Sequence, residues 1–535
     1  MRHMAGRGPA NPLGSLDAAI GPRGSRIMPV ELLRILALAC LGGIAFAGPN
    51  ILFVMSDDHA VPALGAYGGG LISTPNLDRL ANEGVRFDAA FVTNSICTPS
   101  RAVILTGKHS HVNGVLTLSD TFDGSQQTVA KLLRAAGYYT GMVGKWHLKS
   151  EPTGFDEYAV LPGQGLYYDP VLRHTGEWPE AERHEGYVTD VITDQALRFL
   201  DDRPKDMPFF LMYHHKAPHD VFVPKREHAG LFADPIPEPP TLNEDVSERI
   251  ALRETVEAIG LRHTSYGVPE WSWFLTRVRY RPEEIARWER DLAGLSGAAL
   301  RRAQYQIYMR RYLQCVYSID ENMGRVLDYL DQQGLARDTV VIYTSDQGFF
   351  LGEHGLYDKR FMYEPAFRIP LLARWPAEIP AGTSSGELVQ NLDFAPTLLA
   401  AAGVDVPSDM QGRSFLAIAK GRLPADWRDA VYYRYWMSRA HFNIPAHLGV
   451  RTKRYKLIFF YDNHLGPDGT KPVRGARPNV RDPFWEFYDL QEDPLEVNNA
   501  YSDPAYRDRI AALKRRIVEL RNQYGDNADG LAIGD

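Results

Sequence analysis

The sequence predicts an α/β fold with a large mixed, mostly parallel sheet sandwiched by helices, followed by a smaller antiparallel sheet and a closing helix. Short apolar runs alternate with segments of helical periodicity along most of the chain. Strands that alternate with helices form parallel sheets covered on both faces. Near the C-terminus the pattern changes to runs rich in β-branched and aromatic residues, which favours antiparallel strands.

Three apolar runs have the pattern of strands that are buried on both faces. They are "NILFVMS" (50–56), "PFFLMYHH" (208–215) and "DTVVIYTSDQG" (338–348). Each is followed by Asp, His or Gln residues, and parallel sheets bind ligands at the carboxyl ends of their strands. We therefore expect the polar residues after these runs to meet at one site.

Between and after the strands, start and stop signals predict helices. These segments are 74–84, 127–137, 187–202 and 299–334, with a closing helix at 504–524. We divide the chain into a leader (1–47), a main α/β domain (48–420) and a C-terminal subdomain (421–535). Segment 224–297 is rich in proline and charge and lacks strand patterns, so we interpret it as a functional insertion into the main domain.

The leader predicts export of the protein. A basic flank precedes an apolar run from about Leu32 to Phe46, and small residues follow, the pattern of a signal peptide cleaved near Gly48. The run is shorter than a membrane span and contains Arg34, so we expect no stable membrane anchor. A lipoprotein signal at Cys40 fits less well, because the spacing of the preceding leucine is wrong. We expect a periplasmic or extracellular location.

Composition narrows the classes of function. The chain has 535 residues, 44% of them hydrophobic, and a net charge of -7 without a basic block. A globular protein that does not bind nucleic acid is therefore expected. With three cysteines, one of them in the leader, the mature chain is not a disulfide scaffold. Cys315 lies in a helical pattern as a small buried residue, which leaves Cys97 to be explained.

The segment "CTPSRAVILTG" (97–107), together with "GKWH" (144–147), resembles the signature of the type I sulfatases, which belong to the alkaline phosphatase superfamily. The resemblance runs from Asn50 to the C-terminal sheet. In that family the first cysteine of the motif is oxidised by a formylglycine-generating maturation enzyme, and the hydrated aldehyde is the nucleophile. The resemblance implies that Cys97 is so modified and that Arg101 assists it. Chemistry favours this, because a gem-diol can expel sulfate by re-forming its aldehyde.

Two pairs of oxygen donors after strands predict a metal site. "MSDDH" supplies Asp57 and Asp58, and "TSDQG" supplies Asp346 and Gln347. Adjacent carboxylates repel one another unless a cation neutralises them. An all-oxygen donor set favours Ca²⁺, with Mg²⁺ as the second possibility. The sulfatase resemblance implies the same four ligands, although many family members have Asn or His where Gln347 stands.

The resemblance also implies the remaining catalytic groups. "GKWH" supplies Lys145 and His147, "HHKAPH" supplies His219, and "GEHGLYDKR" supplies Lys359. We expect the two lysines to balance the charge of the sulfate. His219, helped by Lys359, is expected to protonate the departing sugar oxygen, and His147 to take the proton that releases sulfate.

Two segments, 351–376 and 441–461, closely resemble the bacterial N-acetylglucosamine-6-O-sulfatases, which act on heparan-type, keratan or mucin glycans. The resemblance implies that Asp358, Arg360 and His447 contact the sugar. An ordinary surface ion pair and a loop histidine remain alternatives for these positions. A sulfatase of another polysaccharide and a phosphodiesterase or phosphonate hydrolase of the same superfamily are alternative functions, and a non-enzymatic glycan-binding protein is a third.

Overall fold

A ten-stranded sheet forms the centre of the residues that the computed structural model describes, 48–259, 282–478 and 480–533. Its strand order is β13-β2-β12-β9-β1-β8-β4-β5-β6-β7, and the five central strands are mutually parallel. The strands are β1 (Asn50–Ser56), β2 (Val85–Phe87), β4 (Tyr139–Lys145), β5 (Glu157–Leu161), β6 (Val171–His174), β7 (Glu182–Arg183), β8 (Phe209–His214), β9 (Thr339–Ser345), β12 (Leu371–Arg374) and β13 (Thr383–Ser385). The predicted mixed, mostly parallel sheet is confirmed.

The central strands are continuous apolar runs because helices cover both faces of the sheet. All residues of β8 and β9 are buried, and in β1 only the first is partly exposed. Covering helices leave no face to water, so the alternation of polar and apolar residues disappears. β1 and β9 run in register from Asn50 opposite Thr339 to Ser56 opposite Ser345. Both strands therefore end at the same level.

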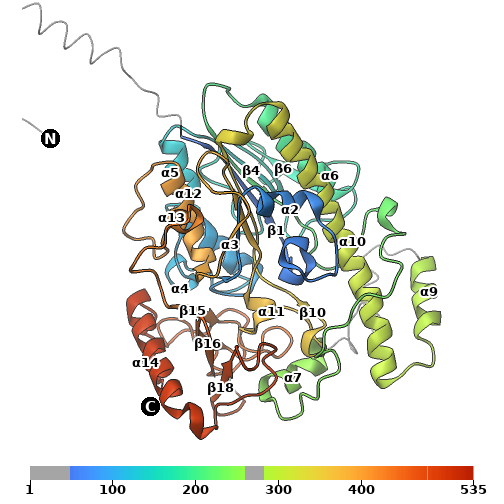
Figure 1. The fold of residues 1–535 in the computed structure, drawn as a ribbon, viewed down its shortest axis with the longest axis vertical. Coiled ribbons are helices and arrows are strands. Elements are labelled where there is room, and N and C mark those ends of the chain that lie inside the picture. Colours follow the sequence, from blue (N-terminus) through green and yellow to red (C-terminus); the bar gives the residue numbers. More distant parts are fainter. Residues whose placement is uncertain (1–47, 260–281, 479, 534–535) are drawn as a thin grey trace, which may run out of the picture. The chain divides into compact units, whose positions relative to one another are not determined.

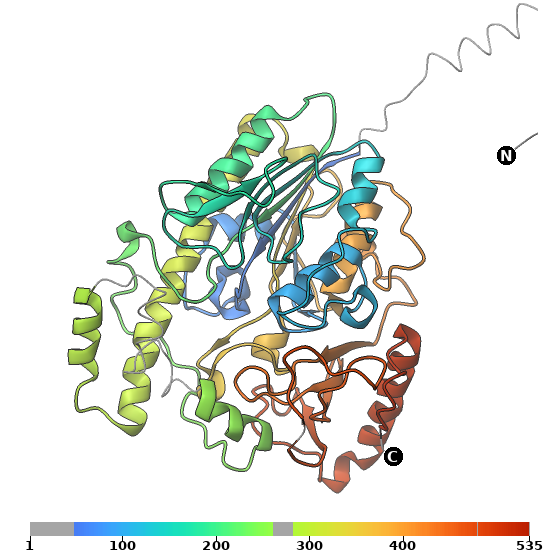
Figure 2. The ribbon, with the colours of Figure 1, turned by 180° about the vertical axis from the view of Figure 1, so that it is seen from behind.

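Two helical layers enclose this sheet (Figures 1 and 2). One layer consists of α2 (Pro75–Asn82), α6 (Val188–Asp202) and α10 (Gly297–Gln332). The other consists of α3 (Cys97–Thr106), α5 (Val129–Ala135) and α12 (Phe394–Ala401). Shorter elements join them: α4 (Ser110–Asn113), α11 (Glu364–Phe367), α13 (Leu416–Ala419) and the two-residue strands β3 (Ala90–Phe91), β10 (Phe350–Leu351), β11 (Tyr357–Asp358) and β14 (Val389–Gln390).

A second sheet lies near the C-terminus and is antiparallel throughout, as predicted. It contains β15 (Ala430–Tyr435), β16 (His447–Thr452), β17 (Tyr455–Phe460) and β18 (Phe484–Asp489). The closing helix α14 (Arg507–Tyr524) lies beside it (Figure 1), and apolar side chains such as Ile517 and Leu457 share a buried cluster. The predicted smaller sheet with its closing helix is confirmed.

The proposed insertion at 224–297 contains α7 (Ile250–Ile259) and α9 (Pro282–Leu292), and its residues 260–281 lie outside the described part. Its described part contacts two other regions. Glu244 Oε2 lies 2.5 Å from His354 Nδ1, and Arg249 Nη2 donates to Tyr488 Oη over 2.9 Å. The insertion thus connects the segment before Lys359 with the C-terminal sheet. Residues from Gly48 onward form one compact unit, and the boundary at 420 stays a prediction.

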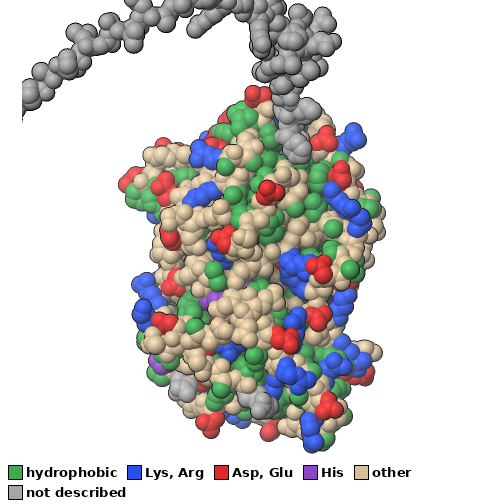
Figure 3. Space-filling view, turned by 90° about the vertical axis from the view of Figure 1, so that its left-hand side faces the viewer, with side chains coloured by type: hydrophobic (Ala, Val, Ile, Leu, Met, Phe, Trp, Pro, Cys, Tyr) green, Lys and Arg blue, Asp and Glu red, His purple; other side chains and the backbone are tan. Residues whose placement is uncertain are grey.

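The predicted leader and signal peptide, residues 1–47, lie outside the described residues. Within the described ranges, no helix combines the length and the apolar character that a bilayer crossing requires. The face of the molecule in Figure 3 carries acidic and basic side chains that are interspersed.

Candidate active site

The carboxylates that follow β1 and β9 lie together at the carboxyl edge of the main sheet. The paired strand ends place Asp57 and Asp346 on neighbouring strands at the same level. Asp57, Asp58 and Asp346 each offer an oxygen within 4.8 Å of the others, and all three are fully buried. Burial, reinforced by the charge of Asp57, raises the pKa of Asp346 to about 7. Such crowding of acids is relieved when a cation joins them.

Gln347 adds a fourth oxygen to this group. Its Nε2 donates to Asp58 Oδ1 over 2.5 Å, while its Oε1 is buried and has no hydrogen-bond partner among the described residues. A half-turn of the amide would direct Oε1 toward the carboxylates. Three carboxylates and one amide oxygen suit a hard divalent cation. The donor set therefore fits a metal ion.

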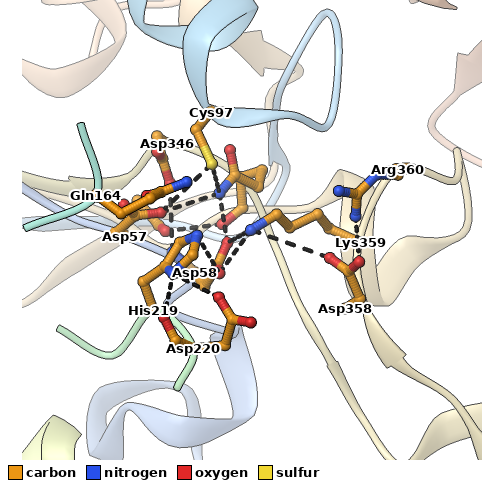
Figure 4. Close-up of polar contacts among 12 residues, drawn as sticks. Asp57, Asp58, Cys97, Gln164, His219, Asp220, Asp346, Asp358, Lys359 and Arg360 are labelled. Atoms are coloured by element: carbon orange, nitrogen blue, oxygen red, sulfur yellow. Dashed lines mark hydrogen bonds and ion pairs between the residues drawn. The ribbon is translucent and has the colours of Figure 1, made fainter. Parts of the chain in front are cut away.

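Three cations lie beside the acids, and one of them, Lys359, is labelled in Figure 4. Lys359 Nζ donates to both oxygens of Asp58 over 2.7 Å, and Arg101 Nε donates to Asp346 Oδ2 over 2.9 Å. Lys145, at the end of β4, forms an ion pair with Asp57. Although burial opposes ionisation, Lys145 and its cationic neighbours hold the pKa of Asp57 well below its usual value. Each acid thus has its own cationic partner.

Cys97 begins α3 and lines a cavity of about 150 Å³ next to these charges. Its Sγ lies 3.7 Å from Asp57 Oδ1, and the residue is 1% exposed. Burial raises the pKa of the thiol to about 12. An unmodified Cys97 is therefore a protonated thiol at neutral pH, and the thiolate that attacks electrophiles is scarce.

Two of the predicted histidines lie near this group. His219 Nδ1 lies 2.6 Å from Asp220 Oδ1, while its Nε2 lies 3.8 Å from Asp58 Oδ2 and the residue lines the cavity. His147 Nδ1 lies 3.5 Å from Thr98 Oγ1. Burial, followed by the charge of Lys145, holds the pKa of His147 well below its ordinary value, so its imidazole is neutral.

The three predicted sugar contacts fall into two environments. Asp358 and Arg360 form an ion pair with each other and line the same cavity as Cys97. His447 is fully buried on β16 and stacks on Tyr433, and its Nδ1–H donates to the Pro445 carbonyl over 2.8 Å. Its Nε2 has no hydrogen-bond partner among the described residues, and it does not line the cavity. Its contact with a sugar stays a prediction.

The structure adds cavity residues that the sequence reasoning missed. Gln164 follows β5 and accepts a hydrogen bond from Lys145 Nζ, and Asp220 follows His219. Phe442 also lines the cavity, with the Arg360 guanidinium 4.9 Å from its ring centre. Gln164 lies in the polar segment that follows an apolar strand, which is the same pattern that led to the prediction of Asp57, Asp58, Asp346 and Gln347. Phe442 has no comparable local signal.

Comparison with known proteins agrees with this geometry. The family model for Sulfatase matches residues 49–404, and a model for the C-terminal part of N-sulphoglucosamine sulphohydrolase matches residues 352–466. The chain is 44% identical over 513 residues to an N-acetylglucosamine-6-O-sulfatase of Bacteroides thetaiotaomicron, covering 90% of this chain and 87% of the relative.

Solved structures resemble the chain in fold. One, of a protein in complex with its substrate D-glucosamine-2-N,6-O-disulfate, has a TM-score of 0.81 and 43% identity, and the match covers 91% of this chain and all of that one. A phosphonate monoester hydrolase from Silicibacter pomeroyi has a TM-score of 0.67 at 21% identity, with 90% and 96% covered, and is similar in fold alone. The chain belongs to the sulfatase family and is a sulfuric ester hydrolase.

Proposed function

We propose that the protein removes the 6-O-sulfate group of N-acetylglucosamine units in a heparan-type, keratan or mucin glycan. The observation that carries the proposal is the cavity of about 150 Å³ that holds Cys97 at one end and the Asp358–Arg360 pair at the other. Its volume suits one small group or part of a sugar ring rather than a long ligand. The 44% identity to an N-acetylglucosamine-6-O-sulfatase supports this choice of substrate.

The cavity's charges favour a sulfate ester. Lys145 forms an ion pair with Asp57, and Lys359 forms one with Asp58, next to the cavity. Although burial opposes it, Asp58 keeps the pKa of Lys359 well above its usual value, so this lysine stays positively charged. We therefore assign it to stabilising charge on sulfate oxygens rather than to proton transfer. Lys145 has the same role.

The nucleophile in this proposal is formylglycine formed from Cys97. As an aldehyde hydrate it supplies an oxygen that attacks sulfur and a second hydroxyl whose deprotonation releases sulfate with return of the aldehyde. The high pKa of the thiol supports a need for the modification. Because Cys97 is buried in the folded chain, we infer that the maturation enzyme acts before folding is complete.

We propose that Asp57, Asp58, Asp346 and Gln347 hold Ca²⁺, with Mg²⁺ as the alternative. The bound cation would supply Lewis acidity toward a sulfate oxygen. Arg101 is not one of these four ligands but holds Asp346 in position. It donates to Asp346 and, through Nη1, to the Lys145 carbonyl over 2.6 Å.

His219 and His147 divide the proton transfers. Asp220 Oδ1, 2.6 Å from His219 Nδ1, holds the ring through that nitrogen, and Nε2 is then the atom that protonates the departing sugar oxygen. His147 is neutral and lies close to Lys145, so it can accept the proton whose removal releases sulfate. The two roles differ: His219 gives up a proton from Nε2, and His147 accepts one.

The leader and the sugar-binding residues complete the proposal. Residues 1–47 would direct export to the periplasm or the extracellular space, where sulfated glycans are encountered. Asp358 and Arg360 would bind sugar hydroxyls by charge-assisted hydrogen bonds, and His447 would add a contact through Nε2.

The test combines mass spectrometry with substrate assays. The peptide containing residue 97 is expected to carry the mass change of cysteine to formylglycine. Sulfate release is expected from N-acetylglucosamine-6-sulfate, with weaker release from other sulfated positions. p-Nitrophenyl sulfate is expected to be cleaved faster than p-nitrophenyl phosphate or a phosphonate monoester. Unmodified Cys97 in an active preparation would overturn the nucleophile, and preferred cleavage of the phosphorus esters would overturn the proposed reaction.

A further inference from the structure

A second group of metal-ligating side chains lies at the far edge of the main sheet. His174 ends β6, Glu182 begins β7 and His184 follows that strand. One ligand atom from each lies within 4.8 Å of the other two, and the Nε2 atoms of His174 and His184 are 3.3 Å apart. None of these three residues lines the cavity at Cys97. The group is therefore separate from the proposed active site.

Strand pairing explains why the three side chains meet. In the antiparallel pair of β6 and β7, Leu172 lies opposite Glu182. Residues two apart along a strand point to the same face, so His174, Glu182 and His184 share one face. That face borders a cavity of about 350 Å³, which α6 closes with Gln195, Arg198 and Phe199.

The spacing of the two nitrogens matches tetrahedral coordination. Zn–N bonds of about 2.0–2.1 Å at a tetrahedral angle place two ligand nitrogens about 3.3–3.4 Å apart. His174 and His184 are partly buried and Glu182 is exposed, so an ion can enter from solvent. Two imidazoles and one carboxylate are a donor set that selects zinc over calcium. The all-oxygen group at Asp57 has the opposite preference.

The charges around the cavity also favour a cation. Its lining includes the carboxylates Glu157, Glu177 and Glu182 and a single guanidinium, that of Arg198. The charged side chains that line the cavity are thus net negative.

We propose that His174, Glu182 and His184 bind one Zn²⁺ ion, with water completing the coordination. The ion would link the end of β6 to the segment around β7 and so fix the connection 175–181 at the sheet edge. It would act on the stability of this edge and not on ester cleavage, because its ligands lie outside the cavity at Cys97.

The test is a zinc titration of the full-length protein. The protein is stripped with a chelator and saturated with Ca²⁺, so that the oxygen-rich group is occupied, and Zn²⁺ is then titrated by calorimetry. One Zn²⁺ per chain is expected. His174→Ala is expected to weaken binding by at least about 100-fold, and Glu182→Gln, at an exposed position, by about tenfold. His111→Ala, a histidine on α4 outside the cluster, is the matched control and should bind zinc as the wild type does.

Two further readouts separate a zinc site from a hydrogen bond between the two histidines. Zn²⁺ should raise the melting temperature of the wild type and of His111→Ala, and should leave that of a His174→Ala/His184→Ala double variant unchanged. Cleavage of p-nitrophenyl sulfate should be the same in all of these proteins. The proposal is overturned if the Ca²⁺-saturated wild type takes up no zinc, or if the double variant binds it with equal affinity and stoichiometry.

Discussion

Two buried groups of charges in this molecule have balanced acids and bases and yet differ in what they can do. At the carboxyl edge of the main sheet, three carboxylates meet three cations beside Cys97. Under the C-terminal sheet, Lys456 lies 2.9 Å from Glu364 Oε1 and 2.6 Å from Glu496 Oε1, and Arg451 lies 3.3 Å from Glu364. Net charge does not distinguish them.

The two groups differ in whether their polar atoms all have hydrogen-bond partners and in whether a cavity gives a ligand access to them. Lys456 also donates to the Met362 carbonyl over 2.7 Å, and Glu496 Oε2 accepts from the Glu364 backbone N–H over 2.6 Å. Although burial opposes it, Arg451 and Lys456 lower the pKa of Glu364 to about 2. The pKa of Glu496 is raised by burial, as is that of Asp346 at the main sheet, so pKa shifts do not separate the two groups. At the main sheet, however, Gln347 Oε1 lacks a hydrogen-bond partner among the described residues, and a cavity adjoins the group. A satisfied cluster holds the fold, whereas an unsatisfied one beside a cavity can bind a ligand.

Replacing Cys97 with Ala is expected to have the largest effect. Turnover of p-nitrophenyl sulfate should fall by at least about 10⁴-fold because the nucleophile is absent, while the melting temperature changes little. Cys315→Ala is the matched control. That residue is buried on α10, so its loss should destabilise the fold by about 1 kcal/mol and leave turnover intact. Turnover by the Cys97→Ala protein at a rate near that of the wild type would mean that the charge cluster beside Cys97 is not the catalytic one.

Lys456→Met tests the second cluster. Removing a fully buried cation leaves Glu364 and Glu496 without their shared partner, which should cost about 3–5 kcal/mol in the free energy of unfolding. Denaturant titration measures this loss, and the folded variant should retain its turnover. Lys453→Met, which breaks the exposed pair with Glu387, should cost at most about 1 kcal/mol. Equal losses of unfolding free energy in the two variants would mean that the buried cluster contributes no more to stability than an exposed ion pair.

His215 provides a test of whether buried polar atoms without hydrogen-bond partners are enough to form a ligand-binding site. Both of its ring nitrogens are buried without hydrogen-bond partners in the described part of the chain, yet it does not line the cavity at Cys97. Burial lowers its pKa to about 3 from 6.5. Between these values the unfolded chain binds a proton that the folded chain does not, so stability falls as the pH drops below 6.5.

His215→Leu should remove this dependence. The variant is expected to unfold with a free energy near that of the wild type at pH 7 and to be more stable than it by about 2 kcal/mol at pH 5. Turnover at pH 7 should be unchanged. Unfolding curves at the two pH values provide the measurement, and a difference that does not vary with pH would show that His215 titrates in the folded protein as it does in the unfolded chain.

The fold was predictable where the pattern depends on burial alone. The runs at 50–56 and 338–348 became β1 and β9 because a strand covered on both faces must be apolar throughout. The same rule brought Asp57 and Asp346 together, since neighbouring parallel strands end at one edge. The short edge strands β6 and β7 were not predicted. They have few buried residues, so neither alternation nor an apolar run marks them.

The site was predictable where a motif or a strand end marks a residue. Cys97 and Lys359 came from motifs and Asp58 from a strand end. Residues that reach the cavity through tertiary packing were not predicted. Phe442 has a positive φ in a loop between β15 and β16, and it contacts Arg360 only in the folded chain. His174 and His184 are ten residues apart, and only the register of β6 against β7 brings them together. Such contacts depend on pairing that local patterns do not encode.

The smallest expected effect concerns substrate choice. Asp358 lies 4.0 Å from Lys359 Nζ and forms an ion pair with Arg360 on the cavity wall. Asp358→Asn keeps the shape but weakens a charge-assisted acceptor for sugar hydroxyls, so KM for N-acetylglucosamine-6-sulfate should rise by about tenfold. The kinetics on p-nitrophenyl sulfate, which has no sugar, should stay unchanged, and the exposed Asp405→Asn should alter neither. Equal losses on both substrates would mean that Asp358 acts through Lys359 and belongs with the charges that bind sulfate.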